Sequence, residues 1–236
     1  MPQTIKISPS TILLKSDPTL PLSNAWFDPE FWRSQHALAG TGNGRGAVWF
    51  IDSEFGKFVI RRYRRGGLIA KFNKSQFFYT GQKHTRPWLE LSLLEHMRSI
   101  DLPVPRPIGG IYRLEKGFYQ AELLTATIDN ANDLFDLLKS GHSHKLNWKE
   151  IGAVIKRFHD NGIYHSDLNC HNIMIDQQDK VWLIDFDKCE QRPPNPKWQQ
   201  DNLDRLKRSL DKESNLHSHF IVSDAQWRDF MEGYRG

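Results

Sequence analysis

The segment His165-Ser-Asp-Leu-Asn-Cys-His-Asn172, with Ile184-Asp-Phe-Asp187 after it, says most about the architecture of this chain. Asp167 and Asn172 are five positions apart, and Asp185 follows at the end of an apolar stretch. A short hairpin between the two segments would bring these three oxygen-bearing side chains to one cleft. Such a set can bind a divalent cation and leave one carboxylate free as a base. The pattern therefore predicts phosphoryl transfer.

The order His-x-Asp-x-x-x-x-Asn, apolar residues and Asp-Phe matches the catalytic loop and metal motif of protein-kinase-like enzymes. It assigns Asp167 as the catalytic base, and Asn172 and Asp185 as the ligands of Mg²⁺. Polar residues that merely cap helices are the structural alternative, which does not explain the ordered set. His165 is expected to orient the loop by hydrogen bonding, because Asp167 is the better-placed base.

A glycine-rich turn in the first half predicts a phosphate-binding element. Gly40-Thr-Gly-Asn-Gly-Arg-Gly46 precedes a predicted strand, and the backbone N–H groups of such a turn can approach phosphates closely. Its glycines alternate, so the turn departs from G-x-G-x-x-G-x-V but keeps the final Gly-x-Val. An ordinary hairpin turn is the alternative. The residues assigned to the nucleotide here are Gly42, Gly44, Gly46 and Val48.

The next predicted strand ends at Arg61, where kinases place a lysine that binds the α- and β-phosphates. An arginine grips two phosphate oxygens and stays charged, so we expect Arg61 to take this role. Arg62 remains the alternative, because only one of two successive strand residues can face the nucleotide. Glu90, on the following predicted helix, is the expected ion-pair partner, with Glu95 as the alternative.

The predicted elements give an α+β chain that forms a single kinase-like domain of two lobes. Residues 1–124 form an antiparallel sheet lobe with one helix, and residues 125–236 form a smaller, mostly helical lobe. A hinge is expected from Glu122 to Asn130, and Glu122 is assigned to the nucleotide site. The predicted strands are 47–51, 55–60, 111–112, 118–124, 172–176 and 180–185, and the predicted helices are 28–38, 86–98, 132–139, 148–160, 203–210 and 225–234.

Composition limits the class of protein. The 236 residues include 39% hydrophobic and 25% charged side chains, which is enough apolar material for a core and excludes a disordered chain. The two cysteines cannot make a disulfide framework, which indicates a reducing compartment, and Cys170 is expected to be buried and inert. Neither a spanning apolar run nor a signal-peptide pattern is found, so we expect neither secretion nor a transmembrane helix.

Positive charge is concentrated in one segment. Between Lys57 and Arg86 there are nine Lys and Arg residues and no acid, although the whole chain has 32 basic and 28 acidic residues and a net charge of +4. Everything outside the segment therefore carries a net negative charge. Such a zone attracts the phosphates of a nucleotide, a nucleic acid or an anionic lipid. A solvated face is the structural alternative.

Three blocks as a set resemble the Kdo kinases of lipopolysaccharide core assembly, a bacterial group within the protein-kinase-like superfamily. The blocks are Gly44-Arg-Gly-Ala-Val-Trp-Phe50, Arg61-Arg-Tyr-Arg-Arg-Gly-Gly-Leu68 and Tyr164-His-Ser-Asp-Leu-Asn-Cys-His-Asn172. The resemblance, over about residues 30 to 235, implies ATP- and Mg²⁺-dependent phosphorylation of the 4-hydroxyl of 3-deoxy-D-manno-octulosonic acid (Kdo) on Kdo–lipid A. It also implies a peripheral position on the cytoplasmic face of the bacterial inner membrane. Arg64, Arg65 and Lys71 are then expected to meet the lipid A head group or the membrane.

Several alternatives stay open at this point. Asp187 stands where kinases have glycine, which disfavours a backbone flip, and it is either a ligand or a structural residue. The same fold could serve a core heptose, an aminoglycoside or a protein, although Pro193-Pro-Asn-Pro196 leaves little room for a peptide-docking segment. A pseudokinase or a nucleic-acid binder is the alternative from a different class. No nucleic acid is expected as a partner, because no motif for one is recognised, and no obligate protein partner is evident.

Overall fold

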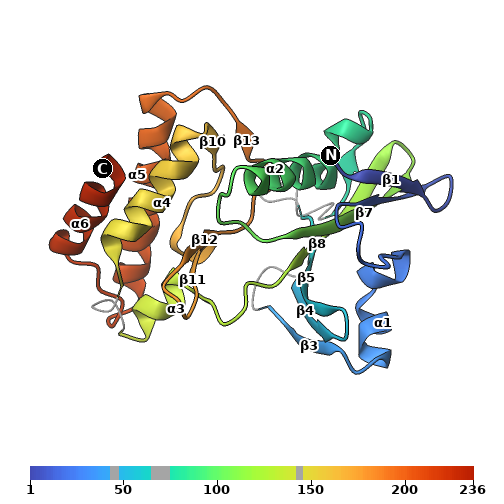
Figure 1. The fold of residues 1–236 in the computed structure, drawn as a ribbon, viewed down its shortest axis with the longest axis horizontal. Helices are drawn as coiled ribbons and strands as arrows, with labels where there is room; N and C mark the ends of the chain where they lie inside the picture. The colour runs from blue at the N-terminus through green and yellow to red at the C-terminus, as the bar shows by residue number, and fades with distance from the viewer. Residues whose placement is uncertain (43–47, 65–74, 142–145) are drawn as a thin grey trace. The chain divides into compact units, whose positions relative to one another are not determined.

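The computed structural model describes residues 1–42, 48–64, 75–141 and 146–236 (Figure 1). The chain forms two compact units. The first contains Met1–His96 and Pro105–Thr127, and the second contains Met97–Val104 and Ile128–Gly236. The chain thus enters the second unit twice, whereas the sequence predicts a single division between residues 124 and 125. The two units are nearly equal in length, and the second is only slightly the shorter.

An eight-stranded antiparallel sheet forms the first unit, in the order β1-β2-β7-β8-β5-β4-β3 with β6 paired to β8 (Figure 1). The strands are β1 (Gln3–Lys6), β2 (Thr11–Lys15), β3 (Leu38–Thr41), β4 (Val48–Ser53), β5 (Gly56–Arg62), β6 (Phe77–Phe78), β7 (Pro107–Glu115) and β8 (Phe118–Ala126). Strands β4, β5, β7 and β8 confirm the sequence-based prediction. The β1–β2 hairpin is harder to predict, because Ile12, Leu13 and Leu14 are all buried and give no alternating pattern.

Helix α1 (Pro29–Ser34) begins where the sequence predicts but ends earlier. The side chain of Asp28 caps it by accepting a hydrogen bond from the Glu30 N–H, and Pro29 occupies the first turn. His36 adopts a φ of 55°, a left-handed conformation that stops the helix before Leu38. With α2 (Arg86–Ser99), the first unit therefore contains residues of two α-helices rather than one.

Helix α2 packs closely on one face of the sheet because β7 has a glycine beneath it. A Cβ atom at Gly110 would lie 2.8 Å from Cβ of Pro87 and 3.2 Å from Cδ1 of Leu91, so no larger residue fits without a shift. The contact fixes the height of α2 over the strands and thereby the position of Glu90. The other face carries an aromatic-rich core that includes Trp26, Trp32, Phe58, Ile60 and Leu124.

The second unit is mostly helical, as the sequence predicts. It contains α3 (Leu134–Lys139), α4 (Trp148–Asp160), α5 (Pro196–Leu216) and α6 (Asp224–Arg235), with the short strands β9 (Asn132–Asp133), β10 (Ile163–Tyr164), β11 (Ile173–Ile175), β12 (Val181–Leu183) and β13 (Glu190–Gln191). The predicted helix 203–210 is longer at both ends. Asn195 caps its start, and Pro196 fits the first helical turn, so the proline loop leads directly into the helix.

Helices α4 and α6 lie side by side in Figure 1, and their backbones meet at two glycines. A Cβ atom at Gly152 would clash with the Phe230 carbonyl oxygen, so only glycine permits this approach. Gly233 has the same relation to the backbone of Lys149. The crossing secures α4, whose C-terminal end leads into the predicted catalytic loop. Among the described residues, no helix has the length and apolar character needed to cross a bilayer.

Candidate active site

The predicted catalytic loop connects β10 to β11 in the second unit and ends in a short 3₁₀ turn, Cys170–Asn172. Asp167 projects from this loop, with 61% of its side chain accessible. Its Oδ1 lies 3.3 Å from Nη1 of Arg205 on α5. A carboxylate in this setting is open to an incoming hydroxyl, which is a requirement for a general base.

His165 is buried and orients the loop, as the sequence predicts. Its Nδ1 accepts the backbone N–H of Asp167 at 3.2 Å, so its Nε2 must carry the proton donated to the Ile184 carbonyl at 3.0 Å. Burial lowers the pKa of His165, which keeps the ring in this neutral form. One imidazole thus ties Asp167 to the residue that precedes Asp185.

Helix α5 holds the loop from outside through one face. Asn202 makes two hydrogen bonds to the backbone of His165: its Oδ1 accepts the N–H at 3.2 Å, and its Nδ2 donates to the carbonyl at 3.1 Å. Two turns later, the Ser209 hydroxyl accepts the Cys170 N–H at 3.1 Å. Arg205 lies between them in sequence and on the same face. The loop is therefore preorganised by a helix and not only by its own turns.

Asn172 and Asp185 are joined through the backbone. The Asn172 side chain donates from Nδ2 to the Asp167 carbonyl at 2.9 Å, and the Asn172 carbonyl accepts the Ile184 N–H at 3.0 Å. Asp185 has a φ of 61°, a left-handed conformation that is uncommon outside glycine and concentrates at functional sites. The Ile184 bond therefore places the two predicted metal ligands next to each other, one at the end of the loop and one just after β12.

The donor chemistry of these residues fits a magnesium ion. Because Nδ2 of Asn172 is used within the loop, its Oδ1 is the atom left for a ligand, and Asp185 supplies carboxylate oxygens. Mg²⁺ is usually held by one or two protein carboxylates together with substrate phosphates and water. Within the described residues there is no group of three or more His, Cys, Asp and Glu that could hold a metal ion by itself.

The Asp185-Phe-Asp187 turn is fastened to the same loop. The Ser166 hydroxyl donates to the Asp187 carbonyl at 2.7 Å, and the Ser166 N–H points to Sγ of Cys189 at 3.2 Å. Phe186 is buried between the rings of Phe158 and His165. Its ring centroid lies 6.1 Å from that of Phe158 and 5.0 Å from that of His165. These contacts favour one stable conformation of the turn. Whether the Asp187 side chain is a ligand stays a prediction.

The first unit contains the expected ion pair between Arg61 and Glu90. Nη2 of Arg61 lies 2.6 and 2.7 Å from the two carboxylate oxygens of Glu90, and the Tyr63 hydroxyl donates to the same carboxylate at 2.8 Å. Glu90 is buried, while Arg61 keeps 21% of its side chain exposed. Glu95 instead pairs with the amino group of Met1. The role of Arg61 toward a nucleotide stays a prediction.

Arg62 and Glu122 lie on the other face of the sheet. Nε of Arg62 donates to Oε1 of Glu122 at 2.9 Å, and Nη1 of Arg113 donates to Oε2 at 2.5 Å. Because Glu122 is buried and both of its oxygens are engaged by arginines, its side chain has a structural role here. The geometry gives no support to its assignment to the nucleotide, and it favours Arg61 over Arg62 as the phosphate-binding cation.

Only part of the glycine-rich turn and of the basic segment can be placed. Val48 is the strand partner of Arg61, so the end of the turn leads to the predicted phosphate-binding residue. The Gly42 N–H donates to the Val48 carbonyl at 3.0 Å, which closes the base of the β3–β4 connection. Arg64 is exposed. The remaining predicted residues, Gly44, Gly46, Arg65 and Lys71, lie outside the described residues.

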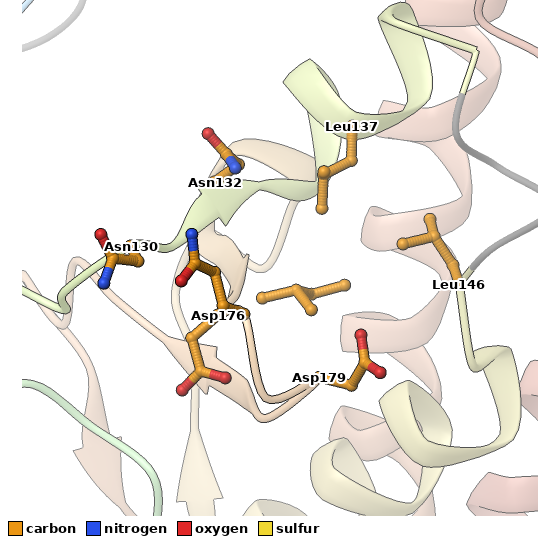
Figure 2. A pocket seen from close by; sticks show the side chains of 8 residues that line it. Asn130, Asn132, Leu137, Leu146, Asp176 and Asp179 are labelled. Atoms are coloured by element: carbon orange, nitrogen blue, oxygen red, sulfur yellow. The ribbon is translucent and has the colours of Figure 1, made fainter.

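A separate pocket of about 250 Å³ lies in the second unit (Figure 2). Leu137, Leu146 and Ile175 form its apolar part, and amide and carboxylate side chains form the rest. Asp176 at its edge accepts hydrogen bonds from two backbone N–H groups of the β11–β12 turn and from the Trp182 indole. It therefore stabilises the hairpin. None of the predicted site residues lines this pocket.

Most of the chain, in both units, is similar to known proteins. Residues 29–234 match the lipopolysaccharide kinase (Kdo/WaaP) family. The chain belongs to this family. As a lipopolysaccharide kinase family member it is an ATP-dependent carbohydrate kinase, which confirms the class of enzyme and the resemblance inferred from the sequence.

Several relatives are named 3-deoxy-D-manno-octulosonic acid kinase. One from Mannheimia succiniciproducens is 41% identical over 94% of this chain and 95% of its own length. One from Vibrio vulnificus is 41% identical over 89% of this chain and 88% of its own length. One from Haemophilus influenzae is 39% identical over 92% of this chain and 93% of its own length. The lipopolysaccharide kinase family match therefore extends to relatives of nearly the same length.

A solved structure described as WaaP in complex with acyl carrier protein is similar to this chain. The match covers 94% of this chain and 88% of that chain, with a TM-score of 0.59. At 14% identity the likeness shows the fold alone. It confirms the α+β, kinase-like architecture predicted from the sequence.

Two residues at the site of this lipopolysaccharide kinase family member are not predicted from the sequence. Asn202 and Arg205 lie on α5, 37 and 38 positions after His165 and Asp167, the loop residues that they contact. No short motif links them to the loop. The signal available in the sequence is the helical spacing of Asn202, Arg205 and Ser209, which places three polar residues close to the buried, apolar face of the helix.

Proposed function

We propose that this enzyme transfers the γ-phosphate of ATP to the 4-hydroxyl of the Kdo sugar of Kdo–lipid A in lipopolysaccharide synthesis. The observation that carries the proposal is Asp167, an exposed carboxylate on a loop held by His165 and Asn202. The relatives named as Kdo kinases support the acceptor. A rigid loop with one accessible carboxylate is suited to orient a sugar hydroxyl for attack.

Each residue then has a definite task. Asp167 orients the acceptor hydroxyl and takes its proton as the oxygen attacks the γ-phosphorus, while the bond from that phosphorus to the bridging oxygen breaks and ADP leaves. Arg61, held by Glu90, binds the phosphates of ATP with the glycine-rich turn beside Val48. Asn172 and Asp185 would hold Mg²⁺, which when bound neutralises charge on the phosphates. His165 keeps Asp167 and the end of β12 in register.

The direct test is incubation of the protein with ATP, Mg²⁺ and Kdo–lipid A, followed by mass spectrometry of the lipid. The expected product gains one phosphate, and fragmentation locates it on the Kdo 4-hydroxyl. Parallel reactions contain a core heptose acceptor or an aminoglycoside. Transfer to one of these, with none to Kdo–lipid A, would reassign the acceptor within the same enzyme class. Phosphate on another Kdo hydroxyl would correct the position alone.

We also infer that the enzyme works at the cytoplasmic face of the inner membrane as a peripheral protein. Phe78 and Phe118 form an edge-to-face pair 5.7 Å apart, with 64% and 37% of their surfaces exposed. Lys116 is exposed two residues before Phe118. Aromatic rings with a nearby cation favour the interface of an anionic bilayer, and the basic segment from Lys57 to Arg86 adds to that attraction.

Sedimentation with phosphatidylglycerol-containing vesicles tests the membrane position. The wild type is expected to pellet with the vesicles, and Phe78→Ser to pellet less. Leu216→Ser is the matched control, because Leu216 is also 64% exposed but lies on α5 in the second unit. Equal pelleting of all three proteins would remove the aromatic pair from the proposal. The absence of an obligate protein partner stays a prediction, and size-exclusion chromatography of the purified protein tests it.

A further inference from the structure

The arginine beside the predicted base comes from α5 and not from the catalytic loop. Between His165 and Asn172 the sequence contains no lysine or arginine. Arg205 reaches the loop from outside, and its Nη1 lies 3.3 Å from Oδ1 of Asp167. Because Asn202 and Ser209 fasten the loop to the same helix face, the position of Arg205 relative to Asp167 is fixed by the fold.

The contact between Arg205 and Asp167 contributes little to folding. Both side chains are largely exposed, at 45% and 61%, and water solvates the charges of such a pair whether or not they meet. One nitrogen–oxygen contact at 3.3 Å also uses only part of the guanidinium, which has five N–H donors arranged for two-point recognition of a carboxylate or phosphate. The arrangement is therefore better suited to an anion that arrives with a substrate.

The proposed function, on which this inference rests, supplies such an anion. The Kdo acceptor is an acidic sugar, so it carries a carboxylate on the same small ring as the hydroxyl that Asp167 would deprotonate. When that hydroxyl lies against Asp167, the carboxylate is within reach of a guanidinium that already touches Asp167. We propose that Arg205 binds the acceptor carboxylate and thereby selects an acidic sugar over a neutral one.

The charges around Asp167 favour this assignment. A carboxylate approaching Asp167 would be repelled unless a cation lay beside it. The phosphates of ATP already have Arg61 and the Mg²⁺ that Asn172 and Asp185 would hold, and Arg64 is assigned to the lipid A head group or the membrane. No other cation among the described residues is assigned to the carboxylate of the acceptor sugar. Arg205 is thus a specificity-determining residue that faces the acceptor.

The test is a substrate-and-mutant cycle. Initial rates are measured for the wild type and Arg205→Gln on Kdo–lipid A and on the same lipid with its Kdo carboxylate converted to the methyl ester. Masking the carboxylate is expected to raise the acceptor KM of the wild type roughly 10- to 100-fold, the worth of a charge-assisted pair. Arg205→Gln should lose a similar factor on the acid and lose almost nothing further on the ester, with its KM for ATP within about twofold of the wild type.

Two further variants separate position from charge. Arg205→Lys keeps the cation but loses the two-point geometry, so its acceptor KM should fall between the wild type and Arg205→Gln. Arg208→Gln removes an exposed arginine three residues further along α5 and should match the wild type on both acceptors. Circular dichroism melts show whether each variant is folded.

The outcomes divide clearly. Equal losses for Arg205→Gln on the acid and the ester would overturn the inference. A raised KM for ATP would overturn it as well and would place Arg205 at the phosphates. Absence of transfer by the wild type to either acceptor would overturn the proposed function and this inference with it. Non-additive losses confined to the acceptor KM would support both.

Discussion

Two arginine–carboxylate pairs, one in each unit, differ in almost every physical respect. Glu90 is buried, receives Arg61 at 2.6 Å and also accepts the Tyr63 hydroxyl. Asp167 is mostly exposed and meets Arg205 at 3.3 Å. Removal of one partner from a buried pair leaves an uncompensated charge, whereas an exposed pair is solvated on both sides.

The difference separates a carboxylate that positions another residue, Glu90, from one that is open to a substrate, Asp167. A buried carboxylate with close donors on both oxygens is closed to a substrate and serves to position its arginine. A carboxylate open to solvent is available to a substrate, and its surroundings must be rigid by other means. In this chain those means are the bonds from His165 and Asn202 to the loop backbone. A change at the buried pair should therefore lower stability, whereas a change at the exposed pair should lower activity and leave stability nearly unchanged.

The largest expected effect is on catalysis at the exposed pair. Asp167→Asn keeps the shape of the side chain but removes the base, so phosphate transfer should fall by roughly 10³-fold. The midpoint of thermal unfolding should hardly move, because the side chain is exposed. Transfer assays and melts on the same preparation check both. Near-normal turnover by this variant would remove Asp167 from its role.

At the buried pair the large expected effect is on the stability of the fold. Glu90→Gln removes the Glu90 carboxylate from Arg61 and Tyr63 and is expected to lower the free energy of unfolding by about 2–4 kcal/mol. Urea denaturation measures it. Glu95→Gln on the same helix is the matched control, because Glu95 is 21% exposed and should change stability by less than about 1 kcal/mol. Equal effects of the two variants would erase the contrast between buried and exposed pairs.

Acid should weaken the surroundings of the exposed pair through His159. Burial lowers the pKa of His159 to about 4, from an ordinary value of 6.5. As the pH falls, His159 takes up a proton in the unfolded chain before it does so in the folded protein. The stability that neutral His159 contributes is therefore fully present above pH 6.5 and is lost as the pH falls toward 4. The loss should be roughly 3 kcal/mol. Urea unfolding at several pH values checks it, and His159→Gln should flatten the dependence, whereas a change of the exposed His219 to Gln should not.

A smaller effect is expected where the loop is fastened to α5. Asn202→Ala removes two hydrogen bonds to the His165 backbone and should lower the free energy of unfolding by about 1–3 kcal/mol, with a further loss of kcat as the loop loosens. Asn215→Ala, at an exposed position of the same helix, should stay within about 0.5 kcal/mol of the wild type. An unchanged kcat in Asn202→Ala would mean that the loop keeps its shape without the helix.

The smallest effect concerns the stability contributed by the exposed pair itself. Arg205→Gln should change the free energy of unfolding by less than about 1 kcal/mol, and about 0.5 M salt should make the difference smaller still. Denaturation at low and high salt checks this. A loss comparable with that of Glu90→Gln would show that both pairs are structural.

The sequence is most informative where chemistry and spacing coincide. It predicts the catalytic loop, the β11–β12 hairpin and α4 because the motif is short and the apolar spacing is regular. It predicts the Arg61–Glu90 pair because strand and helix positions leave few choices. It cannot predict Arg205 or Asn202, since their contacts arise from the packing of a distant helix. It also assigns Glu122, at the start of the expected hinge, to the nucleotide, and that assignment stays a prediction. The sequence does not reveal that Arg62 and Arg113 engage the Glu122 side chain, because their contacts depend on strand pairing.

The double entry of the chain into the second unit has a consequence for fragment design. Met97–Val104 belongs to the second unit, where the Leu183 N–H donates to the Pro103 carbonyl and Arg157 donates to the Asp101 carbonyl. A fragment that starts at Ile128 lacks both partners, and a fragment that stops at Thr127 carries them with nothing to bind. Neither unit can therefore be produced intact as one continuous fragment of the chain cut at residues 127 and 128. A split version of this enzyme would need its break inside a surface turn such as residues 177–179, rather than at the boundary between the units.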